Sequence, residues 1–188
     1  MSTCGYYASG TEIKRLFAVP NSFTSLGRLW GRLTRYVFKL SAGYPRGHQA
    51  GSVMAMAALG SPDKYYDNIY SMATKEFHLV KDHPPGAKRG VYVPPEEEVF
   101  HPYLNKYREL AESSEQEKYD LAASLQKVTE DIISDLMVML LESGFESKNI
   151  CFGGGVSLNS VSLGKLVSEY SDVFDNFFVP PVPYDGGL

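Results

Sequence analysis

A glycine triplet beside a polar side chain is the feature of this sequence whose residue types and spacing could do chemistry. Gly153–Gly155 follow a predicted buried strand, Asn149–Phe152, and precede a helical pattern that begins at about Val156. Glycines let a backbone approach a phosphate closely, and the first N–H groups of a helix lack partners within it. This order of strand, glycine turn and helix predicts an anion site, with Asn159 one turn into the helix and facing the ligand.

The triplet alone is also compatible with a tight turn that binds nothing, since it is neither a Walker loop nor the dinucleotide fingerprint. A second glycine turn follows the apolar run Val173–Val179, where Asp185 precedes Gly186 and Gly187. An acid at the end of a strand lies where open α/β sheets bind ligands, and an Asx turn that caps the next helix is the alternative. We expect Asp185, Asn159 and the triplet to converge on one cleft.

Hydrophobic spacing indicates the elements that must position these residues. Ser114–Glu117 has the Ser-x-x-Glu form of a capping box, and apolar residues then recur at helical spacing until Gly144. These residues predict a long amphipathic helix: Leu121, Leu125, Val128, Ile132, Leu136 and Leu140. A shorter helix, from Val156 to about Tyr170, is expected to join parallel strands at Ile150 and Phe178 as a right-handed crossover.

Upstream, the pattern of Gly5–Val19 predicts two short strands, and Pro20–Ser22 predicts the start of a helix. Residues from about 78 to 113 are rich in helix breakers and predict an exposed, irregular excursion. So few strands predict an α/β fold with a short mixed sheet flanked by helices. We interpret residues 1–188 as one half of a larger domain.

Basic residues recur at helical spacing near the start of the chain: Arg28, Arg32, Arg35 and Lys39. They predict either a solvated polar face or a docking face for an anionic ligand or for the rest of the domain. The net charge of -4 argues against a general nucleic-acid binder, because neutralising several phosphates requires a basic face.

The composition predicts a cytoplasmic protein without membrane partners. No apolar run approaches the roughly 20 residues that a membrane helix needs, and Met1–Gly5 lack the features of a signal peptide. Cys4 and Cys151 form no disulfide framework, and Cys151 is expected to be a reduced, buried thiol within its strand. The irregularly spaced histidines favour exposed or hydrogen-bonded side chains over metal ligands: His48, His78, His83 and His101.

The most specific motifs lie in three stretches, Tyr119–Gln126, Asn149–Asn159 with its Gly-Gly-Val-x-Leu-Asn element, and Phe178–Gly187. Earlier, Asn21–Trp30 carries Ser-Leu-Gly, and Gly51–Gly60 carries a Val-Met pair before Ala, Leu and Gly. Together these stretches resemble the ATP-dependent O-carbamoyltransferases, the nodulation-factor and antibiotic carbamoyltransferases. The resemblance covers most of the chain and is strongest after Tyr119.

This resemblance implies a fold, a reaction and a site. The family's first domain has the actin-like ATPase fold, which is ribonuclease H-like, so the chain is expected to be its second half. The whole protein is expected to transfer a carbamoyl group from carbamoyl-adenylate, formed with ATP, to a hydroxyl of a small molecule or sugar. The resemblance implies that Gly154, Gly155 and Asn159 contact the adenylate beside Gly153 and Gly186, and that Asp185 binds a divalent metal, expected to be iron.

The resemblance also implies partners: an N-terminal half-domain with a His-x-x-x-His metal pair, and a domain that forms carbamoyl-adenylate. That spacing does not occur among the four histidines, so the chain alone is expected to be inactive and marginally folded. Ala50–Ser52 replace the acid, glycine and lysine of many members, and His48 and Gln49 are candidates to substitute for them. Two alternatives stay open: another actin-like phosphotransferase such as a sugar kinase, or a truncated, inactive interaction module.

Overall fold

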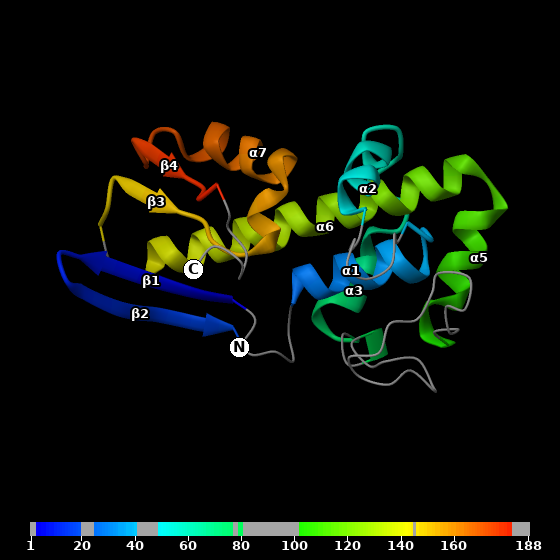
Figure 1. Cartoon of the computed structure of the whole chain (residues 1–188), viewed down its shortest axis with the longest axis horizontal. Coiled ribbons are helices and arrows are strands. Elements are labelled where there is room, and N and C mark those ends of the chain that lie inside the picture. Colours follow the sequence, from blue (N-terminus) through cyan, green and yellow to red (C-terminus); the bar gives the residue numbers. More distant parts are fainter. Residues whose placement is uncertain are drawn as a thin grey trace. The chain divides into compact units, whose positions relative to one another are not determined.

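The computed structural model describes residues 3–19, 25–40, 49–76, 79–80, 102–144 and 146–181, and it is a mixed α/β structure. The chain divides into two compact units, one of Met1–Pro20 with Thr129–Leu188 and one of Asn21–Val128. The boundary between them falls within α6 (Glu115–Glu142), the long helix of Figure 1.

The first unit contains a β-hairpin. Strands β1 (Thr3–Ser9) and β2 (Glu12–Val19) pair antiparallel, and Gly10 in the connecting turn has a φ of 60°. Two-residue hairpin turns require such a positive φ, because it matches the right-handed twist of the strands. The two predicted short strands are confirmed.

A parallel strand pair forms the second sheet of this unit, and the described strands make two separate two-stranded sheets where a single short mixed sheet was predicted. Strands β3 (Asn149–Cys151) and β4 (Asn176–Phe178) pair with Ile150 opposite Phe177, and α7 (Ser160–Tyr170) lies between them in the chain. In Figure 1, α7 lies beside both strands. The expected parallel neighbours are confirmed, and β4 is shorter than its apolar run because the backbone N–H of Phe174 still bonds to Tyr170 at the end of α7.

The core of this unit lies on one side of β3 and β4. Ile150 is buried there with Met137 of α6, Leu166 of α7 and Phe174. Successive strand residues point to opposite faces, so Cys151 points away from this core and is exposed. The prediction of a buried Cys151 was wrong, because the apolar composition of the strand does not reveal which of its faces is covered.

The second unit is helical where the structure describes it. It contains α1 (Leu26–Tyr36), α2 (Ala50–Ala57), α3 (Tyr66–Thr74), the 3-10 helix η2 (Pro102–Leu104), α5 (Asn105–Ser113) and the first half of α6. Its fully buried large side chains include Leu29, Leu33, Val53, Ile69, Met72, Leu104, Leu121 and Leu125. None of the helices among the described residues is both long and apolar enough to cross a membrane.

The long helix was predicted correctly at both ends. The hydroxyl of Ser114 accepts a hydrogen bond from the backbone N–H of Glu117 at 3.1 Å, which is one half of a capping box. The helix ends at Glu142, and Gly144 follows with a φ of 75°. Glycine at this position is the commonest way to end a helix, because it adopts the left-handed conformation without steric cost.

The predicted irregular excursion ends earlier than expected. Residues 102–113 form η2 and α5, so the prediction of about 78–113 was wrong over this part, while residues 78 and 81–101 lie outside the described residues. Pro102 is tolerated because an N–H in the first helical turn has no intrahelical partner. Leu104, Tyr107 and Ala111 then bury one helical face.

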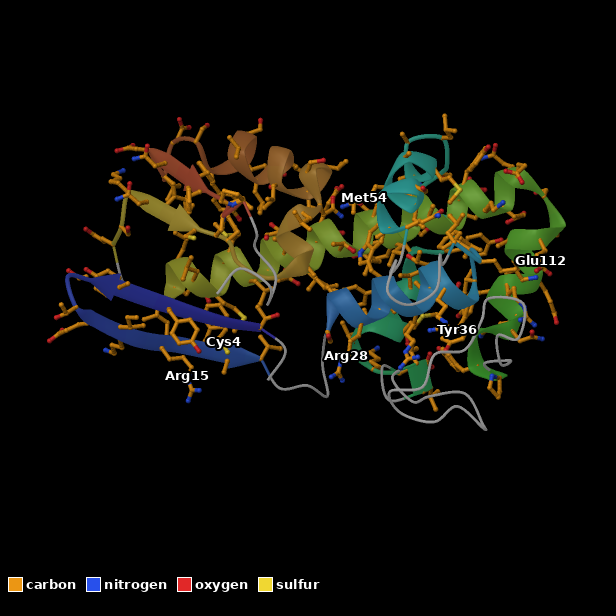
Figure 2. All side chains as sticks on the ribbon, viewed as in Figure 1. Cys4, Arg15, Arg28, Tyr36, Met54 and Glu112 are labelled. Carbon is orange, nitrogen blue, oxygen red and sulfur yellow. The ribbon has the colours of Figure 1, made fainter. Side chains whose placement is uncertain are left out.

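Part of the predicted basic face is engaged within the chain. The guanidinium groups of Arg32 and Arg35 lie 5.7 and 5.4 Å from the ring centre of Tyr36, within the range of cation–π contacts. Lys39 lies beyond α1 and forms an ion pair with Glu112 of α5. Arg28 projects from the exposed side of α1 (Figure 2). A docking function for this face stays a prediction.

Candidate functional site

The glycine turn lies open at the carboxyl end of β3. The backbone N–H of Phe152 bonds to the carbonyl of Phe178 at 2.9 Å, and Gly153–Gly155 leave the sheet directly after it. All three glycines are exposed, and among the described residues a Cβ added at any of them would meet no atom within 4 Å. A ligand can therefore approach this backbone without displacing any of the described side chains.

Gly154 gives the turn its shape. Its φ of 93° and ψ of 160° belong to a region that is essentially restricted to glycine. Residues with a Cβ would be strained there by about 1–3 kcal/mol. The middle glycine of the triplet is thus required by the backbone, whatever the turn binds.

Two elements replace the single helix that was predicted to begin at Val156. A short 3-10 helix, η3 (Gly155–Leu158), comes first, and α7 begins at Ser160 after Asn159. Asn159 is the N-cap of α7: it has non-helical angles, and its Oδ1 accepts from the backbone N–H of Ser162 at 3.1 Å. The prediction that Asn159 lies one turn into the helix was therefore wrong, and its predicted contact with an adenylate stays a prediction.

Ser157 bonds to the glycine turn, and the sequence patterns did not single it out. Its hydroxyl donates to the carbonyl oxygen of Gly154 at 2.6 Å, and its backbone N–H donates to the same oxygen at 3.0 Å. The available signal was a serine three residues after a glycine, since serine hydroxyls commonly bond to a backbone carbonyl three or four residues earlier. This signal is too frequent to be specific by itself.

An ion pair joins α7 to α6 within the same unit. The Lys165 ammonium lies 3.2 Å from Glu130 Oε2 and 3.9 Å from Glu169 Oε1. Burial lowers the pKa of Lys165, but the contact with Glu130 outweighs burial, so the pKa is raised from its ordinary value. Lys165 therefore stays charged at neutral pH, and the pair helps to fix α7, the helix that follows η3.

The other predicted site residues, Asp185 and Gly186, lie outside the described residues, as do the four histidines. The expected convergence of Asp185 with Asn159 and the triplet stays a prediction. Within the described residues, no three His, Cys, Asp or Glu side chains come together in a way that could hold a metal ion. Gln49, the other proposed substitute, is the N-cap residue of α2.

A second polar cluster, in the helical unit, surrounds the carboxylate of Asp120 on α6. Asp120 is 3% exposed, and its Oδ1 accepts from the Ser61 backbone N–H and the Gln116 amide, each at 2.8 Å. Its Oδ2 lies 3.0 Å from the Lys64 ammonium, which also contacts Glu117 at 2.7 Å. Burial raises the pKa of Asp120, but these hydrogen bonds outweigh it and hold the pKa below its usual value.

Gly60 explains why the chain passes so close to this cluster. A Cβ at Gly60 would lie 2.1 Å from the backbone oxygen of Tyr119, which no rotamer change could relieve. The segment after α2 therefore packs directly on the α6 backbone, and the next N–H reaches Asp120. We interpret the Asp120 cluster as stabilising the packing of the segment after α2 on α6, because both oxygens of the Asp120 carboxylate are already bonded to the protein.

Comparison with known proteins shows which protein family this chain matches. A family model described as "Carbamoyltransferase N-terminus" matches residues 4–188. Nodulation protein NolO of Bradyrhizobium diazoefficiens is 28% identical over 185 residues, which cover 95% of this chain and 29% of NolO. Uncharacterized protein sll1178 of Synechocystis sp. is 40% identical over 73 residues, or 38% of this chain and 11% of that protein. The chain thus spans less than a third of the length of either relative.

Proposed function

Because the chain belongs to the carbamoyltransferase N-terminus family, we propose that it is part of an ATP-dependent O-carbamoyltransferase. In this proposal, a carbamoyl group passes from carbamoyl-adenylate to a hydroxyl of a small molecule or sugar. The match over residues 4–188 supports carbamoyl transfer over the phosphotransferase alternative, since it covers nearly the whole chain. The reaction requires a cradle for the adenylate phosphate and exclusion of water, because a mixed anhydride hydrolyses readily.

The observation that carries the proposal is the open glycine turn at the end of β3. Glycines let a backbone approach a phosphate closely, and the open space around Gly153–Gly155 among the described residues leaves room for a phosphate against this backbone. In the proposed complex, Gly154 and Gly155 lie against the adenylate phosphate, and Asn159 lies at the same site. Gly186 is proposed to contribute from the second turn.

We also propose that the chain is half of an actin-like, ribonuclease H-like domain. The parallel β3–α7–β4 unit and the β1–β2 hairpin support this proposal, because strands and helices are both present in the unit that contains them, as an α/β domain requires. The proposed partners of the chain are the hydroxyl substrate, the other half of this domain and a domain that forms carbamoyl-adenylate.

A divalent metal, iron by the family resemblance, is proposed as a further cofactor with Asp185 as one ligand. Such a metal would polarise an acyl or phosphate oxygen. The described residues contain no group of three His, Cys, Asp or Glu side chains that could bind this metal. They therefore do not form a metal site by themselves, and no step of the reaction is assigned to the metal.

Nucleotide binding to the chain tests the proposal, with AMP as the probe of the adenylate part. We expect AMP to shift the backbone amide NMR signals of residues 153–162 in the 15N-labelled chain. Gly155→Ala should weaken AMP binding about tenfold, about 1.4 kcal/mol, because its methyl group occupies the space of the phosphate. The fold should tolerate this change, since Gly155 has neither a positive φ nor an atom within 4 Å of its added Cβ.

Gly164→Ala is the matched control, because Gly164 on α7 also has open space around it and no positive φ. This variant should bind AMP like the unchanged chain. AMP shifts that fall outside residues 153–162, or equal affinities for the two variants, would show that the turn is not the nucleotide site.

A further inference from the structure

Two buried polar side chains tie the glycine turn to the elements that follow it. Ser157 is 7% exposed and Asn159 is 2% exposed, although serine and asparagine are mostly found on protein surfaces. Burial of such groups is unfavourable unless their hydrogen bonds are made. In both residues the side chain makes a bond to nearby backbone, at Gly154 and at Ser162 respectively.

The turn itself supplies little rigidity. Glycine has more backbone freedom than any other residue, and Gly153–Gly155 place three of them in succession. In addition, no atom of the residues that the structure describes lies within 4 Å of a Cβ built on these glycines, so packing against those residues restrains them little. The bonds made by neighbouring polar groups must therefore define the shape of the turn.

Those bonds form a continuous path from the turn to α7. The carbonyl of Gly154 accepts from both the hydroxyl and the backbone N–H of Ser157. The backbone N–H of Asn159, the residue directly after η3, donates to the carbonyl of Val156 at 2.9 Å. The side chain of Asn159 caps α7 through Ser162, which is itself 2% exposed.

We propose that Ser157 and Asn159 are positioning residues that hold the glycine turn in one open shape for its ligand. Asn159 acts through the N-cap of α7 and not by contact of its side chain with the ligand, because its Oδ1 is bonded to Ser162 and the side chain is almost fully covered. The identity of the ligand, an adenylate phosphate, rests on the proposed function. Pre-organisation raises affinity because the turn is not ordered anew at each binding event.

The test compares two pairs of variants in the 15N-labelled chain. Ser157→Ala removes the hydroxyl bond to Gly154, and Ser143→Ala is its control. The Ser143 hydroxyl makes the same kind of bond, to the carbonyl of Leu140 three residues earlier and also at 2.6 Å, but at the end of α6. Asn159→Ala removes the cap, whereas Asn159→Ser keeps a cap oxygen and removes the amide group.

Two measurements are made on each variant. The first is exchange in the turn, defined as amide hydrogen exchange without ligand at positions 157 and 159, whose N–H groups bond to Gly154 and Val156. The second is the dissociation constant of AMP. We expect Ser157→Ala and Asn159→Ala to speed exchange in the turn and to weaken AMP binding, each by about five- to tenfold, the effect of losing one such bond. Ser143→Ala and Asn159→Ser should change both quantities by less than about twofold.

Rescue by serine separates positioning from contact. If Asn159→Ser loses as much AMP affinity as Asn159→Ala while exchange in the turn stays slow, the amide of Asn159 contacts the nucleotide and the proposal is overturned. Unchanged exchange at positions 157 and 159 in both alanine variants overturns it as well. If the unchanged chain binds no AMP but the alanine variants still speed exchange, the proposed function fails and the positioning role stands.

Discussion

Gly60→Ala should destabilise the helical unit strongly, because it adds a methyl group where two backbones touch. The added Cβ would lie 2.1 Å from the carbonyl oxygen of Tyr119 and 2.6 Å from the backbone nitrogen of Asp120. Ordinary contacts of this kind begin at 3.4 Å, so the backbone after α2 must move by more than 1 Å. The Ser61 bond to Asp120, now 2.8 Å, cannot survive a shift of that size in this direction.

The expected loss has two parts. Forcing an extra methyl group into a close-packed contact costs about 1–3 kcal/mol. Leaving the buried Asp120 carboxylate without one donor costs about 1–3 kcal/mol more. The smaller conformational freedom of alanine in the unfolded chain offsets about 0.4–1 kcal/mol of this loss. We therefore expect the free energy of unfolding of this unit to fall by about 1–5.5 kcal/mol.

Trp30 provides the assay. It is the single tryptophan of the chain, it is 6% exposed, and it lies on α1 in the same unit as Gly60. Its fluorescence during urea unfolding should show a lower midpoint in Gly60→Ala, by roughly 0.5–3 M for a slope of about 2 kcal/mol per M.

Gly51→Ala is the matched control for this prediction. Gly51 lies on α2 of the same unit, with no atom within 4 Å of its added Cβ, so its alanine variant should gain about 0.5–1 kcal/mol from helix propensity. The interpretation of Gly60 as a steric contact is refuted if Gly60→Ala unfolds at the midpoint of the unchanged chain, or if Gly51→Ala loses as much stability.

Three further predictions concern the turn, the Asp120 cluster and the metal proposal. Gly154→Ala and Gly144→Ala both place a methyl group in open space at a positive φ, so each should lose about 1–3 kcal/mol of stability, but only Gly154→Ala should weaken AMP binding in a titration. The contact with Lys64 holds the pKa of Glu117 below its usual value, and hydrogen bonds do the same for the buried Asp120. The two ionised carboxylates therefore stabilise the folded state fully above their unfolded pKa values of about 4. This stabilisation is lost as pH falls through their lower folded pKa values. The Trp30 urea midpoint should therefore fall between pH 6 and pH 3, and less steeply in Asp120→Asn; equal slopes would exclude Asp120 as a source. In the full-length enzyme, Asp185→Asn should lower the metal content measured by elemental analysis and leave the circular dichroism spectrum unchanged, and an unchanged metal content would contradict the assignment.

Periodic patterns predicted the parts of the fold that depend on local spacing. The Ser114 cap, the apolar face of α6 and the glycine stop at Gly144 each depend on residues close together in the sequence, and all three were confirmed. The strands at Ile150 and Phe178 were also predicted as parallel neighbours, because a helix of suitable length separates them. In each case the sequence signal lies in the elements themselves or in the short segments that join them.

The wrong predictions concern features that depend on contacts with other parts of the chain, which local residue spacing does not encode. The burial of Cys151 depends on which face of β3 is covered, and the covered face belongs to Ile150. The start of α7 was misplaced because a 3-10 turn can precede a cap, and only the hydrogen bond of Asn159 to Ser162 identifies the true N-cap. Helix α5 was missed because the prolines before it outweighed the spacing of its buried residues.

The glycines of the motif segments can be sorted by the physical reason that each position requires glycine. Gly60 is required by a close backbone contact, and Gly154 by its φ of 93°. Neither reason applies to Gly153 or Gly155, which have open space around them and no positive φ. Packing and backbone geometry within the described chain therefore leave these two glycines unexplained, whereas close approach of a ligand to the backbone explains both. This is why Gly155→Ala, which the fold should tolerate, tests the nucleotide site more directly than Gly154→Ala.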